Sequence, residues 1–240
     1  MQGYGWFACD DMIELVIDGT RALAPRIAEF TLRAASGGLL PTFSAGAHVE
    51  VETAAGWLAY SLLDVPLSPW MYRIAVELQE EGTGGSIWMH RRSVGERLVS
   101  REPRSDFPLP DRTGACLLIA GGIGIAPILC MARVLARYGD RFDLHYVGVD
   151  SASMAYRSEV QALGGHVSID GGDPGRGMAL DTLLADPTPD RRLLACGPAQ
   201  LIDIVLGTAR RMGWSQRNVQ HQSFASVHAI DVPPAAGRSV

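Results

Sequence analysis

Two turns in the sequence combine residues that could bind a nucleotide and react beside it. The first holds Gly121, Gly122 and Gly124, follows the apolar stretch 116–120 and leads into Pro127, a residue type favoured at helix starts. Glycines let backbone N–H groups approach a phosphate or ribose, and a helix N-terminus favours negative charge. The spacing is not GxGxxG, and glycines at such turns also serve packing. Taken alone, this turn favours the structural interpretation.

The second turn is Cys196-Gly197-Pro198, which follows another apolar stretch and opens another expected helix. A thiol here would lie at the mouth of a cleft, close to a bound nicotinamide ring. The alternative is a buried cysteine beside a Gly-Pro turn, and for this turn alone the alternative is favoured.

Two segments in the first half could contact a flavin. Tyr60–Leu62 follows an alternating strand; a tyrosine ring can stack on a flavin and a serine hydroxyl can hydrogen-bond its N5, although most exposed Tyr-Ser pairs do neither. Gly84–Ser86 is glycine leading into a serine helix cap, which forms an anion-binding nest. The alternative for the second segment is a capped helix without a ligand.

The elements that position these residues change character along the chain. In the first half, apolar residues alternate with others over short stretches separated by turns, the pattern of antiparallel strands in a small barrel. In the second half, short apolar strands alternate with helices, which predicts a parallel sheet covered on both faces. We expect strands at 13–17, 28–32, 49–51, 74–78, 116–120, 142–147, 166–169, 193–196 and near 219, and helices at 127–138, 151–163, 179–184 and 199–212.

The predicted fold class is therefore a small antiparallel β-barrel followed by a doubly wound α/β domain with a parallel sheet. The expected boundaries are residues 1–110 for the barrel, 111–228 for the α/β domain and 229–240 for a flexible tail. Doubly wound sheets bind ligands at the carboxyl ends of their strands. Both glycine turns of the second half lie at such ends.

Asp150 follows the second expected strand of the α/β domain, where this architecture places the adenine ribose of a dinucleotide. A carboxylate there accepts hydrogen bonds from ribose hydroxyls and repels a 2′-phosphate, and the nearest following base is Arg157. This arrangement favours NADH over NADPH. The alternative is that Asp150 only caps a helix beginning at Ser151.

Composition excludes several other classes of function. The net charge of −5 gives no support for nucleic-acid binding. No apolar run reaches the roughly 18 residues of a membrane helix, and the N-terminus lacks the pattern of a secretory signal. The four cysteines are far apart and the six histidines are scattered, so we expect no metal site. A cytoplasmic protein with no membrane or nucleic-acid partner is expected.

The order and spacing of these motifs resemble the phthalate dioxygenase reductase branch of the ferredoxin–NADP reductase superfamily, from about Met12 to Phe224. The resemblance implies a flavin-binding barrel and a nicotinamide-binding domain, with hydride passing from NADH to FMN (FAD being possible) at their junction. Electrons would then pass singly to a separate iron–sulfur protein or oxygenase component. The matching stretches are Phe43–His48, Tyr60–Leu62, Tyr72–Val76, Gly82–Ser86, Pro103–Leu109, Ile119–Pro127 and Cys196–Pro198.

The resemblance also implies roles by position, with Ser61 and Cys196 as the catalytic candidates. The cofactor contacts that it implies are Tyr60 and Ser61 at the isoalloxazine, Gly84, Gly85 and Ser86 at the flavin phosphate, Gly121, Gly122 and Gly124 at the nicotinamide nucleotide, Cys196 at the nicotinamide ring, and Phe224 near the flavin ring.

Three departures from the family pattern concern the cofactors. The family's Arg-x-Tyr-Ser motif pairs an arginine with the flavin phosphate, but this chain has Leu58 there, which weakens flavin binding unless Arg73 or Arg91 substitutes. Ala126 replaces a threonine and Gln222 an acidic residue near the rings. A ferredoxin domain usually follows, whereas no cysteine cluster follows here, so the iron–sulfur step is expected on another polypeptide.

These departures keep a rival function open. The rival is a flavin-poor, catalytically inactive subunit that retains the fold and acts as a scaffold or regulator. A flavin-bearing enzyme is yellow, so the absorbance spectrum of the purified protein before and after addition of NADH separates the two.

Overall fold

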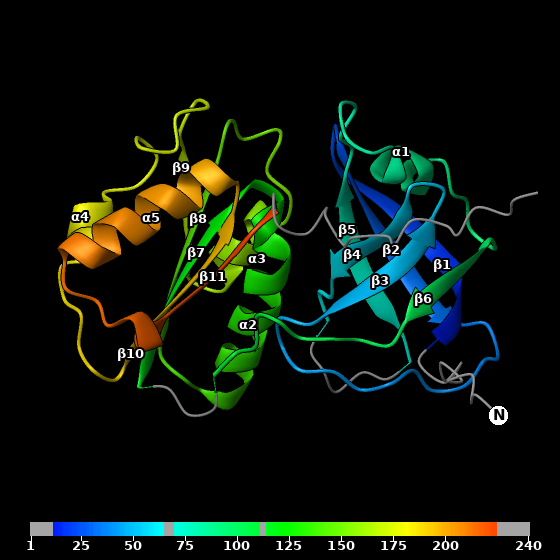
Figure 1. The fold of residues 1–240 in the computed structure, drawn as a ribbon, viewed down its shortest axis with the longest axis horizontal. Helices are drawn as coiled ribbons and strands as arrows, with labels where there is room; N and C mark the ends of the chain where they lie inside the picture. The colour runs from blue at the N-terminus through cyan, green and yellow to red at the C-terminus, as the bar shows by residue number, and fades with distance from the viewer. Residues whose placement is uncertain (1–11, 65–69, 111–113, 225–240) are drawn as a thin grey trace, which may run out of the picture.

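A computed structural model describes residues 12–64, 70–110 and 114–224, which form two lobes (Figure 1). The first lobe is antiparallel β-structure and the second is a parallel sheet covered by helices. The predicted fold class is therefore confirmed. The expected domain boundary at residue 111 and the expected tail 229–240 lie outside the described residues.

The described part of the first lobe contains β1 (Met12–Ala24), β2 (Ile27–Ala34), β3 (His48–Thr53), β4 (Gly56–Ser61), β5 (Tyr72–Glu77), α1 (Gly85–His90) and β6 (Arg97–Arg101). The strands pair in the order β4-β3-β6-β1-β2-β5. The two edges of this sheet meet: a backbone bridge joins Leu62 to Ile74, and the amide of Leu63 donates to the carbonyl of Arg73 at 2.9 Å. The sheet is thereby closed into the predicted barrel.

Alternating apolar residues fill the barrel. Leu15, Phe30 and Val49 are each at most 2% exposed, as period-two alternation predicts for side chains that face inward. Strand β6 was not expected from the sequence. Its buried positions are Leu98 and the polar Ser100, so its apolar pattern is too short to be distinguished from a loop.

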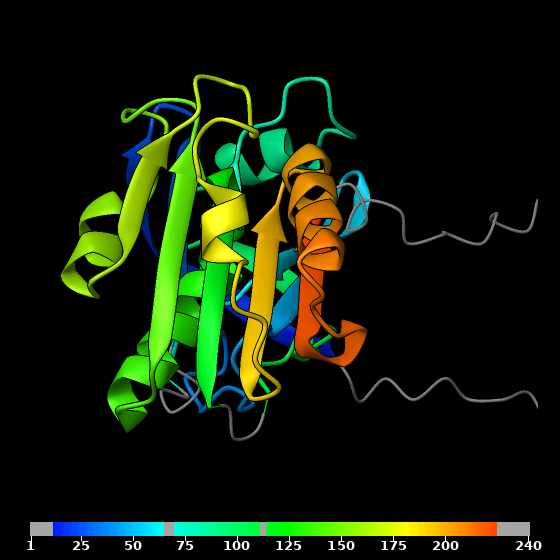
Figure 2. The same cartoon turned by 90° about the vertical axis from the view of Figure 1, so that its left-hand side faces the viewer.

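The second lobe contains the strands β7 (Ala115–Gly121), β8 (Phe142–Gly148), β9 (His166–Ile169), β10 (Arg191–Gly197) and β11 (Val219–Ser223). They pair in the order β11-β10-β7-β8-β9, all parallel. Helices cover both faces of this sheet, as expected for a doubly wound domain (Figure 2). They are α2 (Ile125–Tyr138) and α3 (Arg157–Ala162) on one face, and α4 (Leu180–Leu183) and α5 (Ala199–Arg211) on the other.

The helix expected over 151–163 is shorter than predicted and begins at Arg157. Residues 151–153 form a turn that is hydrogen-bonded to the Asp150 carboxylate. Tyr156 has a φ of 58°, a left-handed conformation that cannot be part of a right-handed helix. The helix therefore begins only after Tyr156.

Helix α2 packs against the barrel and joins the two lobes. A single buried apolar cluster contains the helix and barrel residues such as Phe107. Polar contacts fix the helix in place: the thiol of Cys130 donates to the carbonyl of Asp64 at 2.8 Å, and the Arg133 guanidinium donates to the carbonyl of Leu63 at 2.6 Å. These contacts set the distance between the barrel and the sheet.

A buried carboxylate makes a second link between the lobes. Glu29 in β2 is 5% exposed, and its Oε2 accepts a hydrogen bond from the Tyr156 hydroxyl at 2.8 Å. Arg21 and Arg73 approach the same oxygen at 3.1 and 3.8 Å. A buried charge is tolerated only when it is paired and hydrogen-bonded, so Tyr156 contributes to keeping the two lobes together.

We expect Tyr156→Phe to lower the free energy of unfolding by about 2 kcal/mol, since it removes a hydrogen bond to a buried charged group. Urea denaturation measures the change. Tyr138→Phe is the matched control, because Tyr138 is 66% exposed and its loss of a hydroxyl should be neutral. Equal stability of the two variants would show that the arginines alone hold Glu29.

Candidate functional site

A cavity of about 420 Å³ lies at the junction of the two lobes. From the barrel it is lined by residues of β4, β5 and the segment that leads into α1. From the α/β lobe it is lined by residues at the carboxyl ends of the strands, where such sheets bind their ligands. The lining residues used below are His48, Leu58, Tyr60, Ser61, Glu77, Gln79, Glu81, Thr83, Gly85, Ser86, Ile123, Ala126, Gln222 and Phe224.

The cavity brings together some of the expected site residues but not others. Tyr60, Ser61, Gly85, Ser86 and Phe224 line it. Leu62 points into the barrel core and is fully buried. The expected residues that do not line the cavity are Leu62, Gly84, Gly121, Gly122, Gly124, Asp150, Cys196, Gly197 and Pro198.

The barrel side of the cavity offers an unpartnered hydroxyl. The Tyr60 hydroxyl is buried and has no hydrogen-bond partner, and burial raises the pKa of this phenol. The Nδ1 atom of His48 is also buried without a partner, and burial lowers the pKa of its imidazole. Buried polar groups are nearly always hydrogen-bonded. A ligand with polar atoms at the edge of a ring system would provide the missing partners.

The opposite wall is apolar. Ile123 and Ala126 line the cavity from the turn after β7, and Phe224 lines it from the residue after β11. Phe224 is partly buried against the same apolar cluster that holds α2. Apolar walls with a few polar groups are typical of sites for planar cofactors, so this end of the cavity fits an isoalloxazine ring.

The expected serine cap of helix α1 is wrong. The N-cap is Gly84, at a φ of 94°, and no side chain caps the helix. The Ser86 hydroxyl instead accepts a hydrogen bond from the amide of Gln79 at 2.9 Å. A Cβ on Gly85 would lie 1.7 Å from Cδ1 of Leu58. Gly85 therefore packs closely against the leucine that stands at the family's arginine position, and a larger residue at 85 would displace the end of that side chain.

Neither arginine suggested as a substitute lines the cavity. The Arg73 guanidinium donates to Asp64 at 2.6 Å and lies 3.8 Å from Glu29, so it serves the contact between the lobes. Arg91 is the C-cap residue of α1, at the end of the helix opposite Gly85.

The glycine turn after β7 is shaped by packing. Gly122 has a φ of 54°, and residues 122–124 form a 3₁₀ turn before α2, which begins at Ile125. A Cβ on Gly124 would lie 2.3 Å from the carbonyl oxygen of Cys196. The ends of β7 and β10 can approach this closely only with glycine at position 124. Packing therefore accounts for Gly124, and only Ile123 of this turn reaches the cavity.

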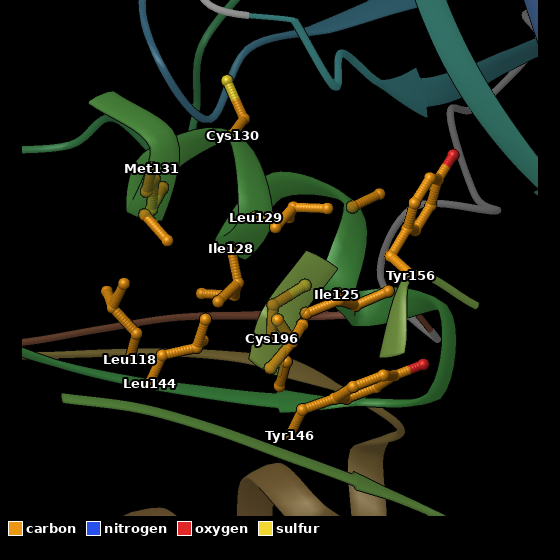
Figure 3. Close-up of a cluster of buried hydrophobic side chains, with 14 of the residues drawn as sticks. Leu118, Ile125, Ile128, Leu129, Cys130, Met131, Leu144, Tyr146, Tyr156 and Cys196 are labelled. Atoms are coloured by element: carbon orange, nitrogen blue, oxygen red, sulfur yellow. The ribbon is translucent and has the colours of Figure 1, made fainter. Parts of the chain in front are cut away.

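Cys196 is buried and does not lie at the mouth of the cavity, contrary to expectation. It is 0% exposed and belongs to the apolar cluster with Ile125 and Leu144 (Figure 3). Burial raises the pKa of its thiol, so the thiolate is disfavoured. Its sulfur lies 3.9 Å from Oε1 of Gln222, and Gln222 lines the cavity. The thiol is therefore one side chain removed from the cavity.

Asp150 caps a turn and also presents a charge. It is exposed at the carboxyl end of β8, and its Oδ1 accepts hydrogen bonds from the amides of Ala152 and Ser153, both at 2.8 Å. These bonds hold the pKa of the carboxyl below its usual value. Asp150 therefore does cap the backbone that follows it, as the alternative proposed. What it caps is a turn at residues 151–153, because the helix begins only at Arg157.

The partly buried Glu77 was not predicted as a site residue. Glu77 ends β5 and lines the cavity, and burial raises the pKa of its carboxyl, with the charge of Arg26 acting in the opposite direction. The sequence offers no local signal for it, because the residue continues an ordinary alternating strand.

Comparisons with known proteins place the chain in a family. No family model matches it. It is 37% identical over 221 residues to a vanillate O-demethylase oxidoreductase of a Pseudomonas species, covering 90% of this chain and 70% of that protein. It is also 37% identical over 220 residues to a heme-dependent oxidative N-demethylase beta subunit of Ectopseudomonas mendocina, with the same coverage. The solved phthalate dioxygenase reductase superposes with a TM-score of 0.84 at 32% identity, over 90% of this chain and 68% of that one.

This chain belongs to the phthalate dioxygenase reductase-like branch of the ferredoxin reductases. It is therefore an oxidoreductase that works with a flavin and a pyridine nucleotide. The cavity between the lobes has apolar walls and an unpartnered Tyr60 hydroxyl, a lining that fits a planar cofactor such as a flavin. No helix in the described ranges is long and apolar enough to cross a membrane.

We expect Cys196→Ala to slow the reduction of bound flavin by the pyridine nucleotide, because the thiol supports Gln222 at the cavity. Cys116→Ala is the matched control, since Cys116 is 1% exposed in the same apolar cluster but lies at the amino end of β7, the end opposite the turn that reaches the cavity. Both variants should lose about 1 kcal/mol of stability. Stopped-flow absorbance and urea denaturation measure the two effects. Identical reduction kinetics in the two variants would leave Cys196 with a packing role alone.

Proposed function

We propose that this reductase takes hydride from NADH onto FMN and passes electrons singly to a separate iron–sulfur protein or oxygenase component. The observation that carries this proposal is the cavity at the junction of the lobes, which has an unpartnered Tyr60 hydroxyl on the barrel side and apolar walls on the other. The relatives named above are components of demethylase systems, which supports an oxygenase or demethylase partner.

The residues around the cavity have distinct roles in this proposal. Tyr60 and Ser61 contact the isoalloxazine, and Ser61 supplies a hydroxyl at the reacting edge of the ring. Phe224 and Ile123 exclude water from the opposite face. The backbone of Gly84–Ser86 lies toward the ribityl phosphate. Dry apolar walls keep the reduced cofactor from reacting with solvent.

The turns at the ends of β7 and β10 form the nucleotide side of the proposed site. The backbone from Gly121 to Gly124 and the segment Cys196–Pro198 would receive the nicotinamide nucleotide, at the sheet edge where doubly wound folds bind dinucleotides. When bound, the flavin supplies the conversion of a two-electron donor into single-electron steps. The protein positions both cofactors across the junction of the lobes.

The proposed function predicts a specific spectroscopic sequence. After reconstitution with FMN, anaerobic NADH should bleach the visible flavin absorbance band, and a one-electron acceptor should restore it. The protein dialysed to equilibrium against equal FMN and FAD should bind mainly FMN, as measured by chromatography of the flavin released from the protein by heat. Release of FAD would overturn the choice of flavin. A flavin-loaded protein that NADH fails to bleach would favour the inactive-scaffold alternative.

We propose NADH as the donor because Asp150 places an exposed carboxylate at the end of β8. Asp150→Asn keeps an oxygen that can accept from the amides of residues 152 and 153 but removes the charge, whereas Asp150→Ala removes both. Both variants should improve the use of NADPH relative to NADH, by at most about fivefold, because the interaction of an exposed charge is screened by solvent.

Steady-state kinetics with each nucleotide and thermal melting separate the two roles of Asp150. Only Asp150→Ala should melt earlier, because only it breaks the turn at residues 151–153. If neither variant alters selectivity and Asp150→Ala merely melts earlier, Asp150 is a turn cap alone.

A further inference from the structure

The flavin cavity has an unusual charge inventory. Its charged lining residues are Glu77 and Glu81, and no arginine is among the described residues that line it. All 21 basic residues of the chain are arginines, so no lysine can supply the missing cation. The remaining titratable lining groups are His48, whose pKa is lowered by burial, and Tyr60, whose pKa is raised by it. Neither group is a cation at physiological pH, and burial also raises the pKa of the Glu77 carboxyl. The described lining therefore offers no positive charge to a phosphate, and its exposed carboxylate is Glu81.

The position where the family places its phosphate-binding arginine is filled by a packed apolar side chain. Leu58 is 7% exposed and lies directly against Gly85. The neighbouring Ser86 hydroxyl is already hydrogen-bonded to the backbone of Gln79. Neither Leu58 nor Ser86 can therefore offer a positively charged donor to a phosphate.

Three further arginines of the barrel lobe make contacts outside the cavity lining. Arg26 donates to the carbonyl of Leu78 at 2.6 Å and lies 3.8 Å from Glu80. Arg92 donates to Glu96 at 2.6 Å and stacks over Trp88. Arg101 forms an ion pair with Glu50 at 2.8 Å and stacks over the Trp57 ring.

This inventory has a direct consequence for the choice of flavin. A phosphate monoester carries a charge of about −1.5 to −2 at neutral pH. Like charges in a partly enclosed cavity repel each other more strongly than they do in water. The isoalloxazine ring and the ribityl chain are uncharged. They match the apolar walls of the cavity and the unpartnered Tyr60 hydroxyl.

We propose that this cavity recognises its flavin through the isoalloxazine and ribityl part alone, so that riboflavin binds at least as tightly as FMN. The inference rests on the proposed function, because it concerns the cofactor of the same site. The terminal phosphate of FMN then contributes nothing to affinity. The flavin is held weakly enough to exchange, unlike a cofactor anchored by a bidentate arginine.

The proposal is tested by titrating the apoprotein with riboflavin and with FMN. Quenching of flavin fluorescence gives the dissociation constant of each flavin, and no turnover is needed. At low ionic strength FMN should bind with equal or up to about tenfold weaker affinity than riboflavin. Added salt should bring the FMN affinity toward that of riboflavin, because screening removes the repulsion, and should leave riboflavin binding unchanged.

A restored cation should reverse the preference. Thr83 is exposed and lines the cavity, so Thr83→Arg introduces a positive charge without disturbing the core. Thr83→Arg should raise the affinity for FMN relative to that for riboflavin by about tenfold, as expected for a new charge-assisted contact with the phosphate. Thr83→Gln, of comparable polarity without the charge, is the matched control and should behave as the wild type.

The outcomes separate this inference from the proposed function. If FMN binds the wild type tighter than riboflavin and salt weakens the FMN binding, the phosphate contributes to affinity, and the inference is overturned while the reductase function stands. If neither flavin binds the wild type, the inference and the proposed function both fail. The inference is supported if riboflavin binds the wild type at least as tightly as FMN does, and if only Thr83→Arg shifts the preference toward FMN.

Discussion

The site depends on how firmly helix α2 and the barrel are held together, because the cavity has walls from both lobes. The contact is partly apolar and partly ionic. Glu29 is buried between the lobes and is acceptable there only because Tyr156 and two arginines surround its carboxylate. The Cys130 thiol and the Arg133 guanidinium add hydrogen bonds from α2 to the barrel backbone. Removing these contacts would alter the cavity without any change to its own lining.

Packing explains glycines to which the family resemblance assigns cofactor contacts. Gly124 lets the turn after β7 approach the backbone of Cys196 closely. Gly85 leaves room for the side chain of Leu58. Each glycine therefore has a steric reason that requires no ligand, and each also leaves backbone beside the proposed site. A family motif of this kind is consequently stronger evidence for the fold than for the individual cofactor contacts.

The electrostatics of the cavity distinguish this protein from the pattern that it resembles. A phosphate anchor would fix a mononucleotide at one end, whereas here the polar and apolar features concentrate at the ring end. The carboxylates of Glu77 and Glu81 also line the cavity, and no arginine of the described residues does. In the proposed site, recognition through the ring would suit a reductase whose flavin exchanges with solution, and the apolar walls would keep water from the hydride-accepting part of the cofactor.

The sequence by itself determined the two-lobed architecture, because period-two alternation and strand–helix alternation are local patterns that can be recognised without knowing which elements pack together. It also identified Tyr60, Ser61, Gly85, Ser86 and Phe224 as residues that come together, through the order of motifs shared with a family. Tertiary structure alone decided that Cys196 is buried behind Gln222, that the Ser86 hydroxyl bonds to Gln79 and that Glu77 faces the cavity. Burial and the choice of hydrogen-bond partner depend on which distant strand or loop covers a side chain, and a local sequence pattern holds no information about that.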